Sequence, residues 1–208
     1  AAILAALLLC AGCAAKPVTA QSFALDTFIT VNLLSGGDEQ IAQDALALVD
    51  DCEALLSAHR EDSEIARLNR APANEAVPLS PLVRNVLAEA LTIAENTDGA
   101  LDITLLAASA LWDYKSEDPQ VPSDEALAEA LTHRGMDRIA LTESGASANG
   151  AQIDLGAVAK GAIGDEVVSL LRERGVSCAL RDMGGNIFTL GNKPDGSAWV
   201  VAIDAPCS

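Results

Sequence analysis

The order of the predicted elements constrains the fold of this chain more than any other feature of its sequence. One strand is predicted at 23–34, helices occupy much of 38–135, and short strands around a single helix at 156–174 follow. Strands and helices segregated in this way favour an α+β fold, with helices packed on a mostly antiparallel or mixed sheet. The 208 residues suffice for one sizeable domain, and we find no internal repeat.

Several helix ends are marked by capping residues. Ser80 is the predicted N-cap of the clearest helix, with Pro81 at its first position and Gly99 just past its end. Asp38 is the predicted N-cap of another helix, and Ser63 could cap a single helical turn within a loop at 59–69.

Short strands are predicted on both sides of the helix at 156–174. Residues 138–142 and 151–154 are predicted strands around a polar turn at 143–150. Three more strands are predicted after the helix, at 176–182, 186–191 and 198–204. A sheet broken off at the last of these would keep an unpaired edge, so we expect a domain that is incomplete at its C-terminus.

Composition excludes one class of function. The formal net charge is −17, and such an acidic surface repels polyanions, which argues against nucleic-acid binding. Half of the residues are apolar, so a packed core is expected. Cys52 lies on an apolar helix face and Cys178 in a strand, and both are predicted to be core residues; no metal is assigned to cysteine.

The first thirteen residues, AAILAALLLCAGC, are typical of a signal peptide that ends in a lipobox. Cys13 is the expected lipid acceptor, and residues 14–22 the tether to a domain over 23–208. We therefore expect an exported protein anchored to a bacterial membrane, on its periplasmic or extracellular face. The alternative is a buried N-terminal helix. The absence of an initiator Met and a basic segment suggests that the natural start lies further upstream.

The segment IDLGAVAKGAIGDEVV, residues 153–168, carries the strongest chemical signal. Free N–H groups at a helix N-terminus bind anions, and Lys160 can reach the same anion as a point charge. Gly156 and Gly161 leave little bulk near the helix start, and Asp154 ends the preceding strand, where a carboxylate can orient a ligand or metal. The alternative is a plain helix whose glycines allow tight packing and whose lysine faces solvent.

Two further segments have both a structural and a functional interpretation. TDGALD, residues 97–102, places Asp98 and Asp102 around a helix end that Gly99 alone could explain. DMGGN, residues 182–186, is either a tight hairpin or a place where backbone approaches a ligand.

Together these pieces resemble the FAD:protein FMN transferase family, the ApbE family, over residues 23–206. The matching segments occur in the family's order: ALDTFITV, LLSAHREDSEIARLN, TDGALDIT, ALWDY, IDLGAVAKGAIGDEVVSLLRERGV and DMGGNIFTLG with WVVAID. The combination of DLGxxxKG with a downstream GGN is the most specific part. The resemblance implies a T-fold-like flavin transferase domain, truncated before the segment that completes the family's metal site.

The resemblance also implies an activity. The family binds FAD with Mg²⁺, cleaves the pyrophosphate and transfers FMN to a Thr or Ser hydroxyl of a target protein, releasing AMP. Membrane redox-complex subunits are the implied acceptors. A Mg²⁺-dependent FAD pyrophosphatase and a non-catalytic flavin-binding lipoprotein are the alternatives.

Site residues are carried over by motif position. Asp154 and Lys160 are expected to contact FAD and to act in catalysis, and the carbonyl of Ala157 is expected to bind Mg²⁺. Leu25 stands where the family often has the Met of its MGT motif, and His59 where an aromatic residue lines the flavin site. The alternative for His59 is a solvated surface residue, which a lone His in an acidic loop more often is. The GAFD segment of the family matches three further FAD-contact residues, namely Ala100, Leu101 and Asp102.

Overall fold

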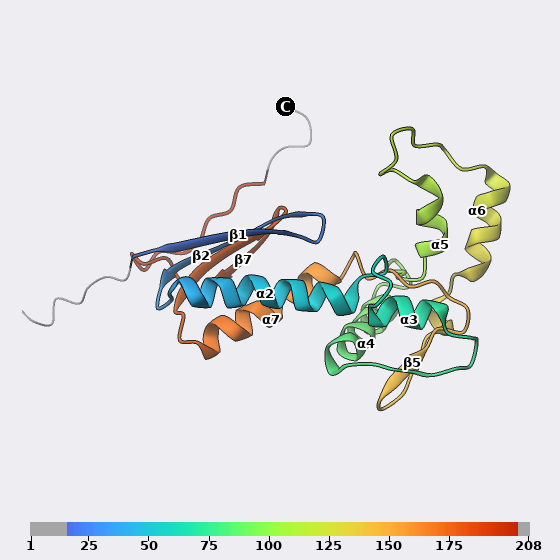
Figure 1. The fold of residues 1–208 in the computed structure, drawn as a ribbon, viewed down its shortest axis with the longest axis horizontal. Helices are drawn as coiled ribbons and strands as arrows, with labels where there is room; N and C mark the ends of the chain where they lie inside the picture. Colours follow the sequence, from blue (N-terminus) through green and yellow to red (C-terminus); the bar gives the residue numbers. More distant parts are fainter. Residues whose placement is uncertain (1–15, 204–208) are drawn as a thin grey trace, which may run out of the picture. The chain divides into compact units, whose positions relative to one another are not determined.

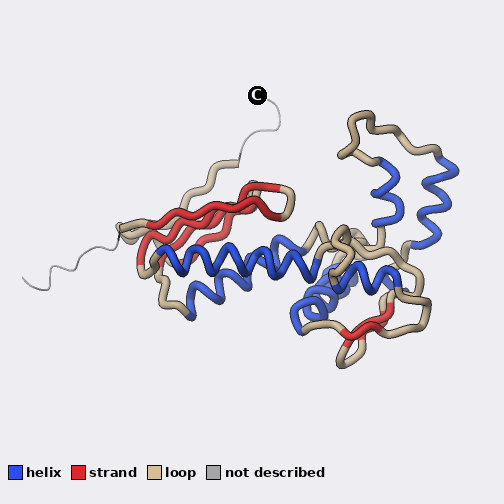
Figure 2. Tube along the Cα trace, viewed as in Figure 1, coloured by secondary structure: helices blue, strands red, loops and turns tan. Residues whose placement is uncertain are grey.

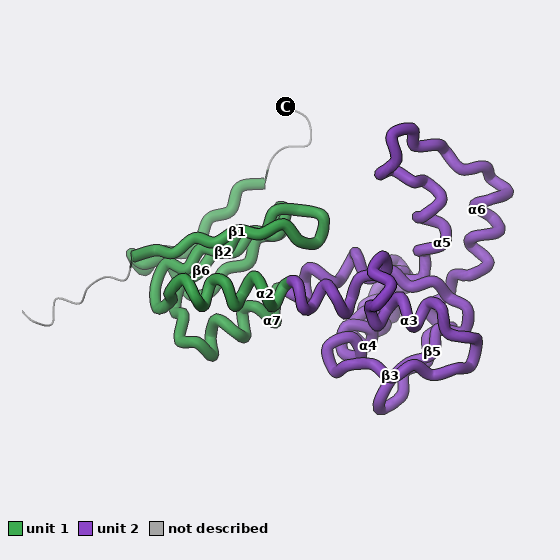
Figure 3. Tube along the Cα trace, viewed as in Figure 1, with its two compact units in different colours: residues 1–49, 164–208 green, residues 50–163 purple. Residues whose placement is uncertain are grey.

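The computed structural model describes residues 16–203, which form two compact units (Figure 3). Unit 1 comprises residues 1–49 and 164–208, and unit 2 comprises residues 50–163. The predicted signal peptide with Cys13 lies outside the described residues, as does the start of the predicted tether. In the described part, no helix is long and apolar enough to cross a membrane.

Unit 1 is built on a four-stranded antiparallel sheet with the strand order β1-β2-β6-β7 (Figure 1). Its strands are β1 (Val18–Ala24), β2 (Thr27–Ser35), β6 (Cys178–Met183) and β7 (Asn186–Leu190). The parts of α2 (Glu39–Leu56) and α7 (Ala159–Glu173) that belong to this unit lie on one face of the sheet (Figure 1). The predicted antiparallel α+β architecture is confirmed.

Alternation along β2 explains which face the helices cover. Ile29, Val31 and Leu33 are buried, whereas Phe28 and its alternate neighbours face the other side. Successive residues of a strand point to opposite faces, so this pattern fixes the register of the strand. Phe28 packs edge-on against Phe23 of β1, with ring centroids 5.5 Å apart, and both rings are exposed.

The single strand predicted at 23–34 is wrong, because the structure has a hairpin there. Leu25 and Asp26 form the turn, with φ of 53° and 58°, and β1 reaches back to Val18. Residues 18–22 of the predicted tether thus lie in the sheet. A two-residue turn with both φ positive normally uses Asn-Gly or Asp-Gly, so Leu-Asp gave no turn signal.

The hairpin between β6 and β7 accounts for the glycines of DMGGN without a ligand. Gly184 and Gly185 have φ of 61° and 88°, as a tight hairpin requires. A Cβ on Gly184 would lie 2.4 Å from Oγ1 of Thr27, so the close approach at this position is to the neighbouring strand. Asp182 accepts a hydrogen bond from the Gly185 N–H at 2.7 Å and closes the turn.

Arg181 of β6 is an unusual member of the core. It pairs with Val31 and Phe188 across the sheet and is only 2% exposed. Its guanidinium carbon lies 4.5 Å from the centroid of the Phe188 ring, and none of its three side-chain nitrogens has a hydrogen-bond partner within the described chain. Burial lowers the pKa of Arg181 to about 10, although the negative charge of Asp165 acts in the other direction and raises it.

Unit 2 is mostly helical, with a small antiparallel sheet in the order β3-β5-β4 (Figure 2). Its helices are α3 (Glu64–Arg70), α4 (Pro81–Asn96), α5 (Leu106–Ser109) and α6 (Asp124–Ala130), and its 3₁₀ helices are Ala110–Trp112, Leu131–His133 and Met136–Arg138. The strands are β3 (Val77–Pro78), β4 (Ala140–Leu141) and β5 (Gly145–Ser147).

The capping predictions are confirmed in both units. The side chains of Ser63 and Ser80 accept hydrogen bonds from the N–H groups of Ala66 and Val83, at 2.9 and 3.5 Å. Asp38 accepts one from Ile41 at 2.9 Å. Cys52 and Cys178 are buried, as predicted from their positions on apolar faces.

Three other boundaries were wrongly predicted. β5 lies inside the predicted polar turn, whereas 151–154 contributes only an isolated parallel bridge between Gln152 and Leu105. α7 begins at Ala159 rather than 156, which places Lys160 at its second residue. Residues 198–203 form no strand: Val200 and Ile203 are 84% and 94% exposed, and a strand requires a hydrogen-bonded partner.

Candidate functional site

Asp154 lies at the end of an extended segment, residues 152–154, that is held on both of its edges. On one edge the Asp154 N–H donates to the carbonyl of Ile103 at 2.8 Å, and the Gln152 carbonyl accepts from Leu106 at 3.2 Å. On the other edge, the segment is bonded to the side chain of Asn69. The half-buried carboxylate of Asp154 is thereby placed by backbone contacts on both sides.

A turn joins this segment to α7. The N–H groups of Val158 and Ala159 both donate to the Leu155 carbonyl, at 2.9 and 2.8 Å, and the helix starts at Ala159. Among residues 16–203, no backbone carbonyl accepts from the N–H groups of Lys160 and Gly161, which are the free donors of a helix N-terminus. An anion at this end would meet these donors, the helix dipole and the Lys160 ammonium together.

The glycines in and after this turn show where the sequence is explained by tight packing and where it leaves room for a ligand. A Cβ on Gly161 would meet nothing within 4 Å, and a Cβ on Gly156 would meet only the carboxylate of Asp154, at 3.3 Å or more. At Gly164, by contrast, a Cβ would lie 2.1 Å from the Phe188 ring. Tight packing therefore explains Gly164, whereas the space beside Gly156 and Gly161 is open to a ligand.

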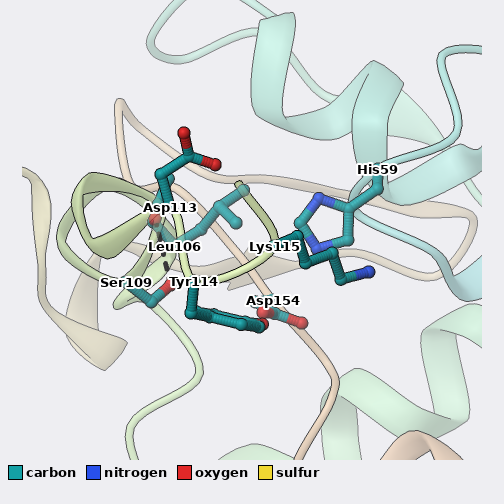
Figure 4. Close-up of a pocket in the computed structure, with 8 residues that line it drawn as sticks. His59, Leu106, Ser109, Asp113, Tyr114, Lys115 and Asp154 are labelled. Carbon is teal, nitrogen blue, oxygen red and sulfur yellow. Dashed lines mark hydrogen bonds between the residues drawn. The ribbon is translucent and has the colours of Figure 1, made fainter. Parts of the chain in front are cut away.

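A pocket of about 240 Å³ lies within unit 2 (Figure 4). It is lined by His59, Leu106, Ser109, Ala110, Asp113, Tyr114, Lys115 and Asp154. In the view of Figure 4, Ser109 and Asp113 lie on one side, His59 and Lys115 on the other, and Tyr114 and Asp154 between them. The lining combines an exposed aromatic ring, apolar side chains and groups of both charges, as a site for a polar aromatic ligand would.

The structure brings two of the predicted site residues together in one pocket. His59 and Asp154 line the same pocket. Ala157 lies on the turn that follows Asp154 and Lys160 is the second residue of α7, and both are outside that lining. Leu25 lies in unit 1, in the turn between β1 and β2.

The predicted FAD contacts at 100–102 do not line the pocket. Ala100 is exposed and Leu101 half-buried, and Asp102 has a structural role. Its Oδ1 accepts from both the backbone N–H and the hydroxyl of Thr104, at 2.8 and 2.5 Å. This turn includes Ile103, whose carbonyl accepts a hydrogen bond from the Asp154 N–H. Asp102 therefore stabilises the backbone that pairs with the segment carrying Asp154.

Sequence reasoning missed most of the pocket lining. The other lining residues all come from a segment for which no site residue was predicted, and they are Leu106, Ser109, Ala110, Asp113, Tyr114 and Lys115. α5 and the 3₁₀ helix after it are too short for a periodic signal. The available signal was Tyr114, an aromatic residue at the start of a polar loop, where it is 70% exposed.

Mg²⁺ prefers oxygen ligands and usually keeps several waters and substrate phosphates in its coordination sphere. Within the described part of the chain, no three or more His, Cys, Asp or Glu side chains are grouped to hold a metal. No backbone N–H of residues 16–203 donates to the carbonyl of Ala157, which lies on an exposed turn. The Ala157 carbonyl is therefore an oxygen that could serve as one ligand of a metal ion.

The fold is that of the flavin transferases. It matches the solved structure of the flavin transferase ApbE from Vibrio cholerae with a TM-score of 0.85 and 26% identity, over 92% of this chain and 64% of that one. The ApbE protein from Thermotoga maritima matches with a TM-score of 0.84 and 27% identity, over 93% and 65% of the two chains. The family model of the ApbE family matches residues 25–207, and the chain belongs to this family.

Curated relatives agree with this assignment. A FAD:protein FMN transferase from Treponema pallidum is 36% identical over 161 residues, which are 73% of this chain and 44% of the relative. One from Vibrio cholerae is 29% identical over 98% of this chain and 64% of its own length. The chain thus spans between about half and two thirds of the length of these relatives.

Proposed function

We propose that this chain transfers the FMN moiety of FAD to a Thr or Ser hydroxyl of a target protein, in a Mg²⁺-dependent reaction that releases AMP. One observation carries the proposal: Asp154 and Lys160 flank a helix start at which Gly156 and Gly161 leave open space that no protein packing requires. The names of the relatives support the same activity.

The helix start is suited to the pyrophosphate of FAD. Its free N–H groups and the Lys160 ammonium are all donors, and they cost no reorganisation when charge develops. Because the chain is strongly acidic, a dianionic ligand needs such a local positive site in order to bind. Lys160 would stabilise the charge of the leaving AMP, and Asp154 would orient the nucleotide.

The pocket beside Asp154 is suited to the flavin ring. Tyr114 offers an exposed aromatic face, and Leu106 and Ala110 offer apolar contact. Stacking on such a surface, with polar groups at the edges, is how proteins hold planar heteroaromatic ligands. We assign His59 to this pocket as well, on the strength of its place in the lining.

The reaction is a phosphoryl-type transfer. The acceptor oxygen attacks the phosphorus of the FMN half and forms a phosphoester. The bond from that phosphorus to the bridging oxygen breaks, and AMP leaves with this oxygen and the electron pair. The hydroxyl proton passes to a base that we do not assign. When bound, Mg²⁺ would neutralise charge on the pyrophosphate, and the carbonyl of Ala157 would be one of its ligands.

Location and partner form part of the proposal. The N-terminal sequence pattern supports an exported protein, lipid-anchored at Cys13. An anchored enzyme of this kind meets acceptors at the membrane surface, and we propose a membrane redox-complex subunit with a Thr or Ser flavinylation site as the target.

The test is to incubate the chain with FAD, Mg²⁺ and a candidate acceptor domain. Flavin fluorescence on the acceptor in a denaturing gel, with one AMP released per flavin attached, is the expected result. The same assay is run on the chain continued with any sequence that its gene encodes downstream. AMP and free FMN with an unlabelled acceptor from both forms would instead identify a pyrophosphatase. FAD binding without AMP in either form would identify a non-catalytic flavin-binding protein.

A further inference from the structure

Asn69, near the end of α3, makes a pair of hydrogen bonds that no other side chain makes with the site segment in the described structure. Its Oδ1 accepts from the Ile153 N–H, and its Nδ2 donates to the Ile153 carbonyl, both at 2.8 Å. The Gln152 side chain adds a third bond, to the backbone carbonyl of Asn69 at 3.0 Å. The two partners lie 84 positions apart in the chain.

The paired bonds imitate a neighbouring strand. A backbone segment that lies beside another strand satisfies both its N–H and its carbonyl, and here an amide side chain does the same for one residue. The opposite edge of the segment is already bonded to Ile103 and Leu106. Ile153 is fully buried, so without Asn69 its two polar groups would be left unpaired away from water.

The position of Asp154 depends on this arrangement. The Ile153 carbonyl belongs to the peptide unit that enters Asp154, so a bond that fixes this carbonyl also fixes the direction in which the Asp154 side chain leaves the backbone. Asn is the side chain that supplies one donor and one acceptor at this length. Asp lacks the donor, and Leu lacks both.

α3 is itself firmly held. The Ser63 hydroxyl caps its first turn and donates to the carbonyl of Ser57. Oε2 of Glu64 accepts from the Ser80 N–H at 2.7 Å. The loop that carries His59 lies between Ser57 and Ser63. One short helix thus anchors the loop at its start and Asp154 at its end.

We propose that Asn69 is a positioning residue for FAD, which acts by holding the peptide before Asp154. This inference rests on the proposed function, since it gives Asp154 a ligand to orient. Asn69 lines neither the pocket nor the helix start, but it fixes the position of Asp154, which lies between the two. Residues that orient the ligands of a metal ion typically change affinity or activity about 10- to 100-fold when they are removed, and we expect a loss of the same order at Asn69.

The test measures FAD affinity and melting temperature for Asn69→Ala, Asp154→Asn and the double variant. We expect each single change to weaken FAD binding by about tenfold or more, and the double variant to bind no more weakly than Asp154→Asn alone, because effects of coupled residues are not additive. Asn69→Asp keeps the acceptor and the shape of the side chain, so it decides the question if Asn69→Ala does not fold.

Asn149→Gly is the matched control. The Asn149 side chain also forms two hydrogen bonds with backbone, donating to Arg138 at 2.7 Å and accepting from Asn74 at 2.8 Å, and Gly tolerates its φ of 49°. We expect this variant to lose stability and keep its FAD affinity. Additive losses at Asn69 and Asp154, or an unchanged affinity in Asn69→Asp, would overturn the positioning role alone. A wild-type chain that binds no FAD would overturn the proposed function with it.

Discussion

Asp154 Oδ1 lies 2.8 Å from the backbone nitrogen of Gly156, which donates a hydrogen bond to it. This bond folds the carboxylate onto the turn that leads into α7. The second oxygen, Oδ2, accepts no hydrogen bond from any described residue, so it remains available to a ligand. The carboxylate of Asp154 and the free N–H groups at the start of α7 therefore lie within residues 154–161. The contribution of each group to ligand binding can be tested separately.

Lys160→Ala is expected to lower kcat/KM for AMP release from FAD by roughly a hundredfold or more, as the loss of one preorganised donor to a developing charge does. Lys160→Arg should recover part of the rate, because the charge remains while the geometry changes. Arg172→Ala is the matched control: it removes an exposed cation from the last turn of the same helix. Equal rates in Lys160→Ala and wild type would remove this lysine from the mechanism.

Gly161→Ala and Gly164→Ala should have opposite effects on stability. Ala is favoured over Gly in a helix by about 1 kcal/mol, and the Cβ at position 161 meets nothing, so the first variant should melt at a higher temperature. The second should melt lower, because its Cβ would lie 2.1 Å from the Phe188 ring. Thermal denaturation measures both.

The same pair of variants tests the ligand. If a pyrophosphate lies against the helix start, Gly161→Ala binds FAD more weakly in spite of its higher stability. A stabilised Gly161→Ala variant with unchanged FAD affinity would show that the open space beside this glycine is not the binding site.

Tyr114→Ala is expected to raise the Kd for FAD, because stacking of a planar base on an aromatic side chain is worth about 1–3 kcal/mol. Tyr114→Phe keeps the ring and should stay within about twofold of wild type. Fluorescence titration of FAD distinguishes the two. Since the ring is 70% exposed, neither variant should change the melting temperature by much, and similar affinities in Tyr114→Ala and wild type would count against a flavin in this pocket.

Arg181→Met is expected to stabilise the fold. The guanidinium is buried with none of its nitrogens hydrogen-bonded to a described residue, and replacing a poorly paired buried charge by an apolar side chain often gains about 1–4 kcal/mol. The cation–π contact with Phe188 is lost, which offsets part of that gain. Chemical denaturation at neutral pH gives the difference in the free energy of unfolding.

The pH dependence of this difference has a definite sign. The pKa of Arg181 is lowered to about 10 in the folded chain, so above that pH and up to the ordinary pKa of an arginine the unfolded chain binds more protons. Wild-type stability should therefore rise relative to Arg181→Met as the pH increases through about 10. A difference that stays constant over this range would mean that the buried group is not the cause.

Local signals predicted much of the structure. The caps at Asp38, Ser63 and Ser80 were read correctly because capping is a contact between residues three positions apart. The α+β class followed from the order of elements. Asp154 and Lys160 could be named together as candidate site residues because they lie six positions apart, on either side of the turn that leads into α7.

The features that could not be predicted from the sequence depend on pairing between residues far apart in the chain. The turn at Leu25–Asp26 lacks glycine, so the strand pairing, not the local sequence, forces both residues to positive φ. β5 consists of Gly, Ala and Ser, which have little strand propensity, and it forms because β3 and β4 flank it. The hydrogen bonds of Asn69 to Ile153 join residues too distant for any local pattern to connect.

That separation of 84 positions also has a kinetic consequence. Closing so long a loop is slow compared with forming a helix turn, so the segment before α7 acquires its native edge late in folding. A ligand of this site consequently finds no partial version of it in the unfolded chain. The ligand binds only folded molecules, and at a concentration of a hundred times its Kd it raises the free energy of unfolding by about 2.7 kcal/mol.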